Sequence, residues 1–286
     1  MSSKMKVGQV GVGGFGAVRR ANMRQTQLFD LVACYDSDAA AMEDAVEEDG
    51  AEAVGSYDEL LDTPELEAMV ISTGDRFHAD QAAAAADRGL HVFVERPLCA
   101  TAAEVDRILD AADRNHVVMG CGHHDHRSEA LSSQLKGMLD SGEIGQVAAF
   151  EATTCRPGGW HGKHDDGDDD LQEHADGMLL ACGVDEVHEL MYYFGAVARV
   201  FARMRHDINP DTPTADAAQC QLEFASGLTG TLNVYHVAPY RHTLDIFGTR
   251  TNIYRDSRFF HQGDVVNTQT TDHSGRFRSE ERRVGK

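Results

Sequence analysis

The fold of the first half of the chain is indicated by ten residues near its start, Val7-Gly8-Gln9-Val10-Gly11-Val12-Gly13-Gly14-Phe15-Gly16. An apolar strand runs directly into the pattern Gly-x-Gly-x-x-Gly, and a helix-like segment follows. In such a turn Gly11 permits a tight bend, Gly13 lets the backbone approach a pyrophosphate, and Gly16 lets helix and strand pack closely. The start of the helix then offers N–H groups to phosphate. The pattern predicts a dinucleotide site made by Gly11, Gly13, Gly14, Phe15 and Gly16.

A carboxylate follows this turn at the spacing that such a site requires. Asp36 ends the second strand-like run and lies 20 residues beyond Gly16. A carboxylate there can accept hydrogen bonds from both ribose hydroxyls, and it repels a 2′-phosphate. We therefore predict NAD rather than NADP as the cofactor. The alternative is a structural glycine turn with a surface aspartate, because Gly-x-Gly-x-x-Gly alone also arises by chance in glycine-rich chains.

Strand-like and helix-like segments alternate through about the first 120 residues. The expected strands are Val7–Val10, Leu31–Tyr35, Met69–Ser72, His91–Val94 and Val117–Cys121, and the expected helices are Ala17–Gln25, Asp38–Glu48, Ala79–Arg88 and Ala102–Asn115. This alternation makes βαβ units, which build a parallel sheet covered on both faces. Right-handed crossovers favour a doubly wound sheet. We predict an α/β domain of this kind over residues 1–122.

The alternation of strands and helices ends after Cys121. The expected elements are helices at Ser128–Ser141 and Met178–Phe194 and strands at Val147–Ala152, Val200–Arg205, Ala217–Glu223, Thr229–Tyr235 and Thr243–Phe247. This order predicts an α+β domain over residues 123–272, built on a mostly antiparallel open sheet. Residues 273–286 carry five basic and two acidic side chains, whereas the preceding residues sum to −24. We expect a truncated domain followed by an atypical basic tail, either frayed or foreign to the chain.

The overall charge excludes several classes of protein. The 286 residues carry a net charge of −21, and a surface this negative repels nucleic acid. No apolar run is long enough for a membrane helix, and no leader precedes Met5. The six cysteines form no Cys-x-x-Cys pair, so we expect reduced thiols in a cytoplasmic protein. Only five of the 26 basic residues are lysine, which is typical either of high-salt adaptation or of a GC-rich genome.

Two further turns follow strands of the predicted parallel sheet and, with the glycine turn, form a set of motifs that resembles a known family. Thr73-Gly74-Asp75-Arg76-Phe77-His78 follows the third strand, and Glu95-Arg96-Pro97 follows the fourth. With Asp140–Gly145, Met191–Gly195 and Phe247–Thr249, the sequence resembles the glucose–fructose oxidoreductase/inositol dehydrogenase (Gfo/Idh/MocA) family up to about Phe260. The resemblance implies a Rossmann domain, a second domain whose open sheet forms a homo-oligomer (dimer or tetramer), and NAD-dependent hydride transfer on a sugar or cyclitol hydroxyl. It also implies that the nicotinamide half is framed by Thr73, Asp75, His78, Glu95 and Arg96.

The chain departs from this family at two catalytic positions. The family's Glu-Lys-Pro lysine is Arg96, and arginine stays charged, so it can orient a substrate but is a poor acid or base. The family's Gly-x-His-x-x-Asp reads Gly183-Val184-Asp185-Glu186-Val187-His188, with the two residue types exchanged. Asp185 and His188 share a helix face and are our catalytic candidates, with Arg96. The alternatives are a non-catalytic NAD-binding homologue and a lyase or hydrolase that retains NAD.

The histidines suggest a substrate pocket more than a metal site. Zinc needs three or four converging ligands, and sequence neighbours rarely converge without other segments. We therefore predict no metal site. The resemblance implies that loops after the fifth strand and around the single tryptophan border the substrate. The substrate-contact candidates are His123, His124, Trp160, His161 and Lys163.

Overall fold

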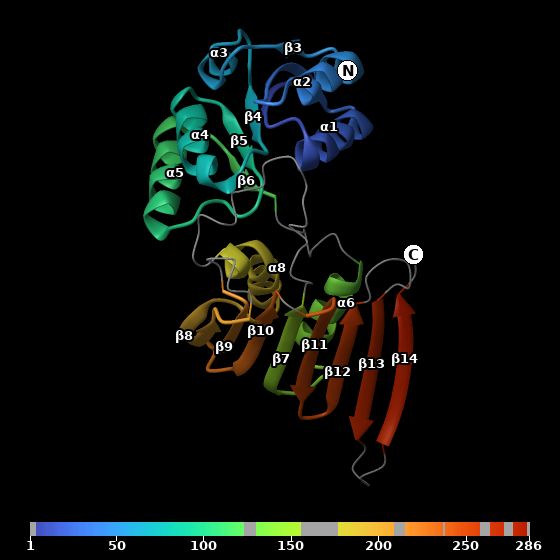
Figure 1. The fold of residues 1–286 in the computed structure, drawn as a ribbon. Coiled ribbons are helices and arrows are strands. Elements are labelled where there is room, and N and C mark those ends of the chain that lie inside the picture. The colour runs from blue at the N-terminus through green and yellow to red at the C-terminus, as the bar shows by residue number, and fades with distance from the viewer. Residues whose placement is uncertain are drawn as a thin grey trace. The chain divides into compact units, whose positions relative to one another are not determined.

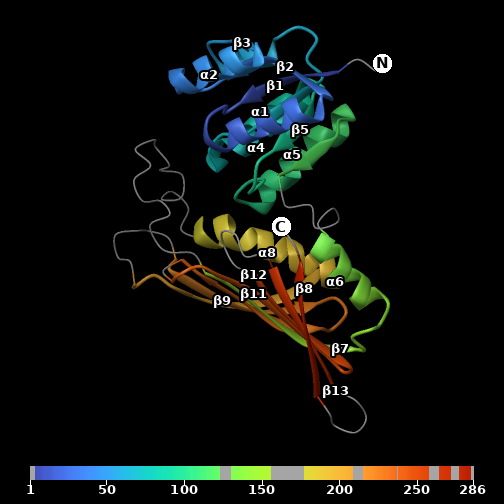
Figure 2. The ribbon, with the colours of Figure 1, turned by 90° about the vertical axis from the view of Figure 1, so that its right-hand side faces the viewer.

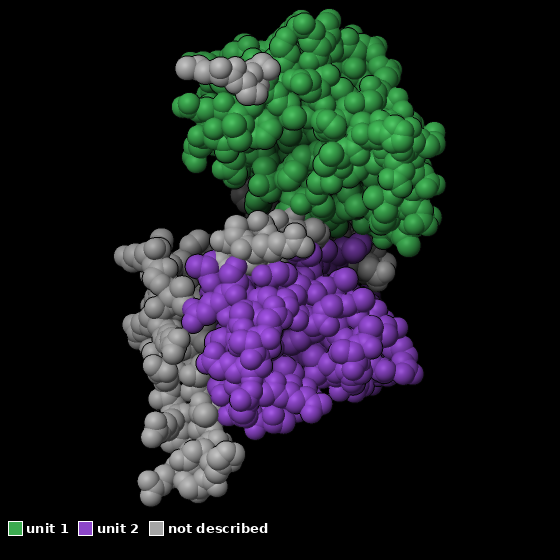
Figure 3. Space-filling model, turned by 180° about the vertical axis from the view of Figure 1, so that it is seen from behind, with its two compact units in different colours: residues 1–123 green, residues 124–286 purple. Residues whose placement is uncertain are grey.

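The computed structural model describes residues 4–122, 130–155, 177–208, 215–236, 238–257, 264–271 and 277–284. The chain divides into two compact units, residues 1–123 and 124–286 (Figure 3). Each unit is built on its own β-sheet. No helix in these described ranges is long and apolar enough to cross a membrane.

The first unit is a six-stranded parallel sheet with the strand order β3-β2-β1-β4-β5-β6 (Figure 1). Its elements are β1 (Met5–Val10), α1 (Gly14–Thr26), β2 (Phe29–Tyr35), α2 (Ala39–Asp49), β3 (Glu52–Ala53), α3 (Tyr57–Leu61), β4 (Ala68–Ile71), α4 (Asp75–Asp87), β5 (His91–Val94), α5 (Ala102–Asn115) and β6 (Met119–Cys121). The order reverses between β1 and β4, and such a switch point is where open α/β sheets bind ligands. The predicted doubly wound sheet is confirmed.

Apolar side chains cover both faces of this sheet. One buried cluster joins Met69 and Ile71 of β4 to the alanines of α4 and to Ile108 of α5. A second joins Leu31 and Cys34 of β2 to small residues of α2. The alanines of α4 present little side-chain volume, so the helix backbone can lie close to the strands. Burial on both faces explains why the strands read as short continuous apolar runs.

Three local features differ from the sequence expectation. The helix expected from Ala79 begins at Asp75, because Gly74 adopts the extended N-cap conformation directly after β4. The short β3 and α3 were not expected, since two residues show no periodicity and five make little more than one helical turn. The hydroxyl of Ser56 nevertheless caps α3 by accepting a hydrogen bond from the N–H of Glu59.

The second unit is an eight-stranded sheet with the order β14-β13-β12-β11-β7-β10-β9-β8. Its elements are α6 (Ala130–Asp140), β7 (Val147–Cys155), α8 (Gly177–Phe194), β8 (Val197–Arg205), β9 (Ala217–Phe224), β10 (Thr229–Tyr235), β11 (Arg241–Gly248), β12 (Thr251–Ser257), β13 (Asp264–Thr271) and β14 (Phe277–Val284). The β7–β10 pair is parallel, and the other described pairs are antiparallel. The expected mostly antiparallel sheet is confirmed.

Helices α6 and α8 lie on one face of this second sheet (Figure 2). An aromatic group joins α8 to the sheet: the ring of Phe150 on β7 stacks on Phe194 of α8 at 5.1 Å and meets Phe224 of β9 at 5.6 Å. Gly230 on β10 leaves the space that the Phe150 ring occupies, because a Cβ there would overlap the ring. The core of the unit therefore lies between α8 and the central strands.

The basic segment at the end of the chain contributes to the sheet. Phe277–Val284 form β14, which pairs antiparallel with β13 over all eight residues. Composition suggested a tail separate from the domain, because arginines outnumber apolar residues there. Backbone pairing at a sheet edge does not require apolar side chains, so composition alone does not reveal such a strand.

Candidate functional site

The glycine turn lies at the switch point of the first sheet, where β1 and β4 end. Gly11 has φ +77°, and a Cβ there would lie 2.5 Å from the carbonyl atoms of Ser72. A Cβ on Gly16 would overlap the carbonyl oxygen of Gly11, so α1 packs directly on the turn. Both positions therefore require glycine, for close packing of the turn against β4 and α1.

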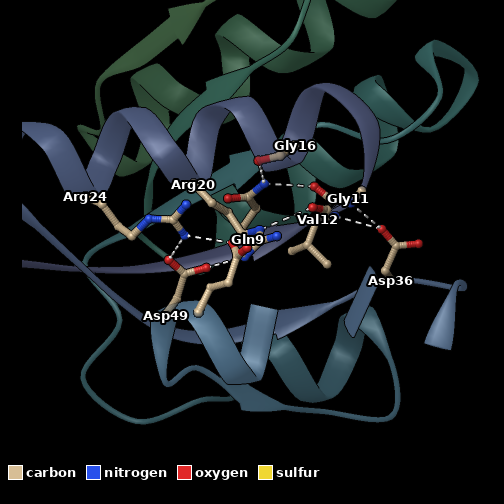
Figure 4. A network of polar contacts seen from close by, with 10 residues as sticks. Gln9, Gly11, Val12, Gly16, Arg20, Arg24, Asp36 and Asp49 are labelled. Atoms are coloured by element: carbon tan, nitrogen blue, oxygen red, sulfur yellow. Dashed lines mark hydrogen bonds and ion pairs between the residues drawn. The ribbon is translucent and has the colours of Figure 1, made fainter. Parts of the chain in front are cut away.

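Asp36 lies beside this turn at the end of β2. Its Oδ2 accepts hydrogen bonds from the N–H of Val12 at 2.7 Å and of Gly13 at 3.2 Å (Figure 4). Its Oδ1 accepts from the N–H of Asp38 at 3.0 Å. Three backbone donors thus fix the carboxylate, which remains partly exposed. The structure brings Asp36 and the glycine turn together, as the spacing in the sequence predicts.

The start of α1 fits a bound pyrophosphate. Gly13 is the N-cap and supplies no side-chain hydrogen bond, so the first-turn N–H groups have no side-chain acceptor in the described residues. A helix start of this kind attracts anions through its free N–H groups and its dipole. Gly14 follows with φ +47° and open space at its Cα, and the next side chain, Phe15, is 60% exposed. These residues could hold the phosphates of NAD.

The turns after β4 and β5 are tied together by His78. This side chain is 1% exposed, and its ring nitrogens lie 2.9 Å from the carbonyl oxygen of Thr73 and 2.8 Å from that of Pro97. The hydroxyl of Thr73 donates to Oε1 of Gln81 at 2.6 Å. Asp75 lies in the first turn of α4. The ring of His78 therefore holds the two turns predicted to frame the nicotinamide.

An ion pair connects α1 with the end of β5. Arg19 of α1 donates from Nε to Oε1 of Glu95, whose side chain is 10% exposed. The guanidinium carbon of Arg19 also lies 5.2 Å from the centre of the Phe93 ring. A Cβ on Gly122 would lie 2.8 Å from Oε2 of Glu95. Sequence reasoning predicted Glu95 but missed Arg19, which belongs to no recognised motif.

The predicted catalytic residues lie in both units. Arg96 follows Glu95 in the first unit and is half-buried. Asp185 and His188 lie on α8 of the second unit, where Asp185 is half-buried with Oδ1 enclosed and His188 is exposed. Gly183 places α8 against the sheet, because a Cβ there would lie 3.2 Å from Cγ2 of Val234. The α8 helix thus carries two of the three candidates.

A buried ionic group fixes α8 to its sheet, and sequence reasoning missed it. The guanidinium of Arg255 on β12 binds both carboxylate oxygens of Glu189, and both side chains are at most 6% exposed. The hydroxyl of Tyr193 donates to Oε1 of Glu189 at 3.1 Å, and burial raises the pKa of that hydroxyl. Nε2 of His242 lies 3.3 Å from Arg255. Glu189 and Arg255 are 66 residues apart, so no local motif indicates this pair.

The predicted substrate contacts fall outside the described residues. These are His123, His124, Trp160, His161 and Lys163. In the ranges that the structure describes, no group of three or more His, Cys, Asp or Glu side chains could hold a metal ion.

The fold and the turn define a dinucleotide-binding α/β protein with a second, mostly antiparallel domain. Residues 5–123 match the family described as "Oxidoreductase family, NAD-binding Rossmann fold", and residues 132–254 match the "GFO/IDH/MocA C-terminal domain". The chain belongs to the Gfo/Idh/MocA family of oxidoreductases, and its first domain is an NAD-binding Rossmann domain.

Several characterised proteins are similar to this chain. A myo-inositol 2-dehydrogenase of Thermotoga maritima is 24% identical over 88% of the chain and 75% of its own length. An inositol 2-dehydrogenase of Salmonella typhimurium is 32% identical, over 50% of the chain and 43% of its own length. The structure of a levoglucosan dehydrogenase in complex with NADH has the same fold, with a TM-score of 0.82 and 20% identity over 99% of this chain and 81% of that one.

Proposed function

We propose that the protein oxidises a secondary hydroxyl of a sugar or cyclitol and reduces NAD in the same step. The observation that supports this proposal is the Asp36 carboxylate held on the Val12 and Gly13 N–H groups, beside the uncapped start of α1. That arrangement suits a ribose with free hydroxyls followed by a pyrophosphate. The named relatives, two inositol dehydrogenases and a levoglucosan dehydrogenase, support a polyhydroxylated substrate.

In the proposed reaction the hydrogen on the carbinol carbon leaves as a hydride to the cofactor, and the hydroxyl hydrogen leaves as a proton to the protein. Bound NAD supplies the hydride acceptor. Asp185 takes the hydroxyl proton as the carbonyl forms, and His188, three residues further along α8, accepts that proton on its way to solvent. Arg96 donates hydrogen bonds to substrate oxygens and stays charged throughout. In the reverse direction the carboxyl group of Asp185 returns this proton to the substrate oxygen.

Cofactor titration and an absorbance screen test this proposal together. We expect calorimetry to show that NAD binds, and the absorbance at 340 nm to rise with at least one sugar or cyclitol. Asp185→Asn should lower kcat at least 100-fold, the typical contribution of a general base, and leave the Kd for NAD unchanged. Glu143→Gln, which changes an exposed carboxyl of the same unit, is the control and should keep full activity.

Two outcomes would contradict it. NAD binding without an absorbance change on any polyol would favour a non-catalytic homologue. Product formation without net NADH would favour a lyase or hydrolase that retains its cofactor. An active Asp185→Asn variant would remove Asp185 from the mechanism and leave the oxidoreductase proposal in place.

A further inference from the structure

The ion pair between Arg19 and Glu95 brings two opposite charges to the carboxyl end of β5. The side chain of Glu95 is 10% exposed and that of Arg19 is 26% exposed. The guanidinium also lies over the ring of Phe93, two residues before Glu95 on β5. An ion pair at this depth adds little net stability, because the loss of hydration offsets most of the attraction. Stability alone therefore does not explain why charged residues stand at these positions.

A glycine at the end of β6 leaves room for this pair. A Cβ on Gly122 would lie 2.8 Å from Oε2 of Glu95 and 3.2 Å from NH2 of Arg19. The φ of Gly122 lies outside the left-handed region, so the backbone conformation does not require glycine there. The space taken up by the two charged side chains does require it. The local sequence is therefore adapted to the ion pair.

The order of the strands indicates which half of a bound dinucleotide lies near Glu95. Asp36, the proposed ribose ligand, follows β2, and the glycine turn that suits the pyrophosphate follows β1. The next strands across the sheet are β4 and then β5. A dinucleotide that runs from β2 across β1 continues towards β4 and β5, so its nicotinamide end approaches the turn that carries Glu95. The nicotinamide ring is cationic in NAD and neutral in NADH, so charges at this turn act differently on the two forms.

We propose that Arg19 is a positioning residue that sets the relative affinity of the protein for NAD and NADH. By pairing with Glu95, it offsets the attraction of that carboxylate for the cationic nicotinamide. Arg19 acts through Glu95 and not through contact with the ring. The pair thereby favours the reduced cofactor, which is the form that oxidation of an alcohol produces. The proposal rests on the binding of NAD and on the place of its nicotinamide half, and it does not depend on the substrate proposed above.

Calorimetry with NAD and with NADH, without any polyol, tests the proposal. The measurements are made at pH 8.5, well above the usual titration range of carboxyl groups, and at constant ionic strength. Arg19→Met removes the cation and leaves the carboxylate, so the ratio of the Kd for NAD to the Kd for NADH should fall about tenfold. A tenfold change is about 1.4 kcal/mol, the Coulomb energy of two unit charges about 12 Å apart at an effective dielectric constant of about 20.

The opposite change should have the opposite sign. Glu95→Gln removes the carboxylate and leaves the cation, so the ratio should rise by a similar factor. The double variant Arg19→Met/Glu95→Gln loses both charges and should return the ratio to within about threefold of its original value. A distorted α1, or a weaker attraction for the pyrophosphate, changes both Kd values alike and leaves the ratio unchanged.

Two controls separate the charge at this site from the charge of the whole protein. Arg19→Lys keeps the cation and should leave the ratio within about twofold. Arg24→Met removes the same charge from α1, but Arg24 pairs with Glu48 and Asp49 of α2, so the ratio should again stay within about twofold.

Three outcomes would overturn the proposal: an unchanged ratio in folded Arg19→Met protein, an equal shift with Arg24→Met, or shifts of the same sign with Arg19→Met and Glu95→Gln. If Arg19→Met does not fold, Glu95→Gln becomes the test, and an unchanged ratio in that variant overturns the proposal.

Discussion

At the scale of single residues, Asp36 combines two tasks. Its carboxylate accepts hydrogen bonds from three backbone N–H groups, two of them from the glycine turn, and we propose that it also binds a ribose of the cofactor. A carboxylate has room for about four hydrogen bonds, so accepting from the backbone leaves capacity for a ligand hydroxyl. Substitution of Asp36 should therefore affect both cofactor choice and the stability of the turn.

Asp36→Arg should reverse the preference between the two dinucleotides. We expect the Kd for NAD to rise at least tenfold and the Kd for NADP to rise much less, because the guanidinium can pair with a 2′-phosphate. The free energy of unfolding should fall by about 1–2 kcal/mol, since the N–H groups of Val12 and Gly13 lose their acceptor. Calorimetry with both dinucleotides measures the first effect and urea titration the second. Equal weakening of NAD and NADP would contradict this role of Asp36.

The sequence predicts the part of the site that consists of local motifs. The glycine turn and Asp36 follow from spacing along one strand–helix–strand segment, and the structure brings them together. Arg19 could not be predicted in the same way, because it belongs to no recognised motif and its partner lies 76 residues away.

At the scale of elements, the position of α8 depends on one buried ion pair. Glu189→Gln leaves the Arg255 guanidinium without its carboxylate, so the free energy of unfolding should fall by about 3 kcal/mol. Glu223→Gln is the control, because its pair with Arg199 is exposed and exposed pairs contribute at most about 1 kcal/mol. Urea denaturation measures both variants. Similar losses in the two variants would show that the buried pair has no special role.

Two acidic side chains face each other on neighbouring strands of the second sheet. Asp245 on β11 lies directly opposite Glu151 on β7, and burial, followed by the charge of Glu151, raises the pKa of Asp245 above its usual 3.8. The folded state therefore binds the proton more tightly than the unfolded state does. Between pH 3.8 and the raised pKa, stability falls as the pH rises.

Asp245→Asn should consequently stabilise the protein at neutral pH. We expect a gain of about 0.5 kcal/mol at pH 7, the usual size of a like-charge pair across strands. The gain should disappear below about pH 4, where the aspartate is protonated in both states. Urea midpoints across this pH range measure the effect, with Asp113→Asn on the exposed side of α5 as the control. A gain in stability that persists at low pH would mean that packing, and not charge, is its cause.

Periodicity predicts most elements but fails where polar residues are buried. The strand β12 was not predicted, because Arg255 occupies an inward position where an apolar residue would mark the alternation. The expected strand at Val200–Arg205 begins at Val197 in the structure, and its side chains are mostly exposed. Such exposed edge strands follow from backbone pairing, for which the side-chain pattern gives little signal.

At the scale of the whole molecule, the net charge of −21 opposes the compact state. Salt should therefore stabilise this protein: the screening length falls from about 10 Å to about 3 Å between 0.1 and 1 M. We expect the urea midpoint to rise over this range in KCl and equally in NaCl. Sulfate is unsuitable for the comparison, because it stabilises proteins by exclusion from their surface. A midpoint that falls with salt would mean that ion pairs outweigh the repulsion.

The central position of β7 has a consequence for synthesis on the ribosome. The two neighbours of β7 in the sheet are β10 and β11, and Phe150 of β7 pairs with Gly230 of β10 and with Ile246 of β11. Both partners are therefore translated at least 80 residues after Phe150. At a translation rate of about 5–20 residues per second, β7 therefore remains without either neighbouring strand for roughly 4–16 s after its own translation. By then every residue of the first unit has been translated. Nascent chains stalled after the translation of β7 and before that of β10 should therefore contain a folded first unit and an unpaired β7 that recruits chaperones.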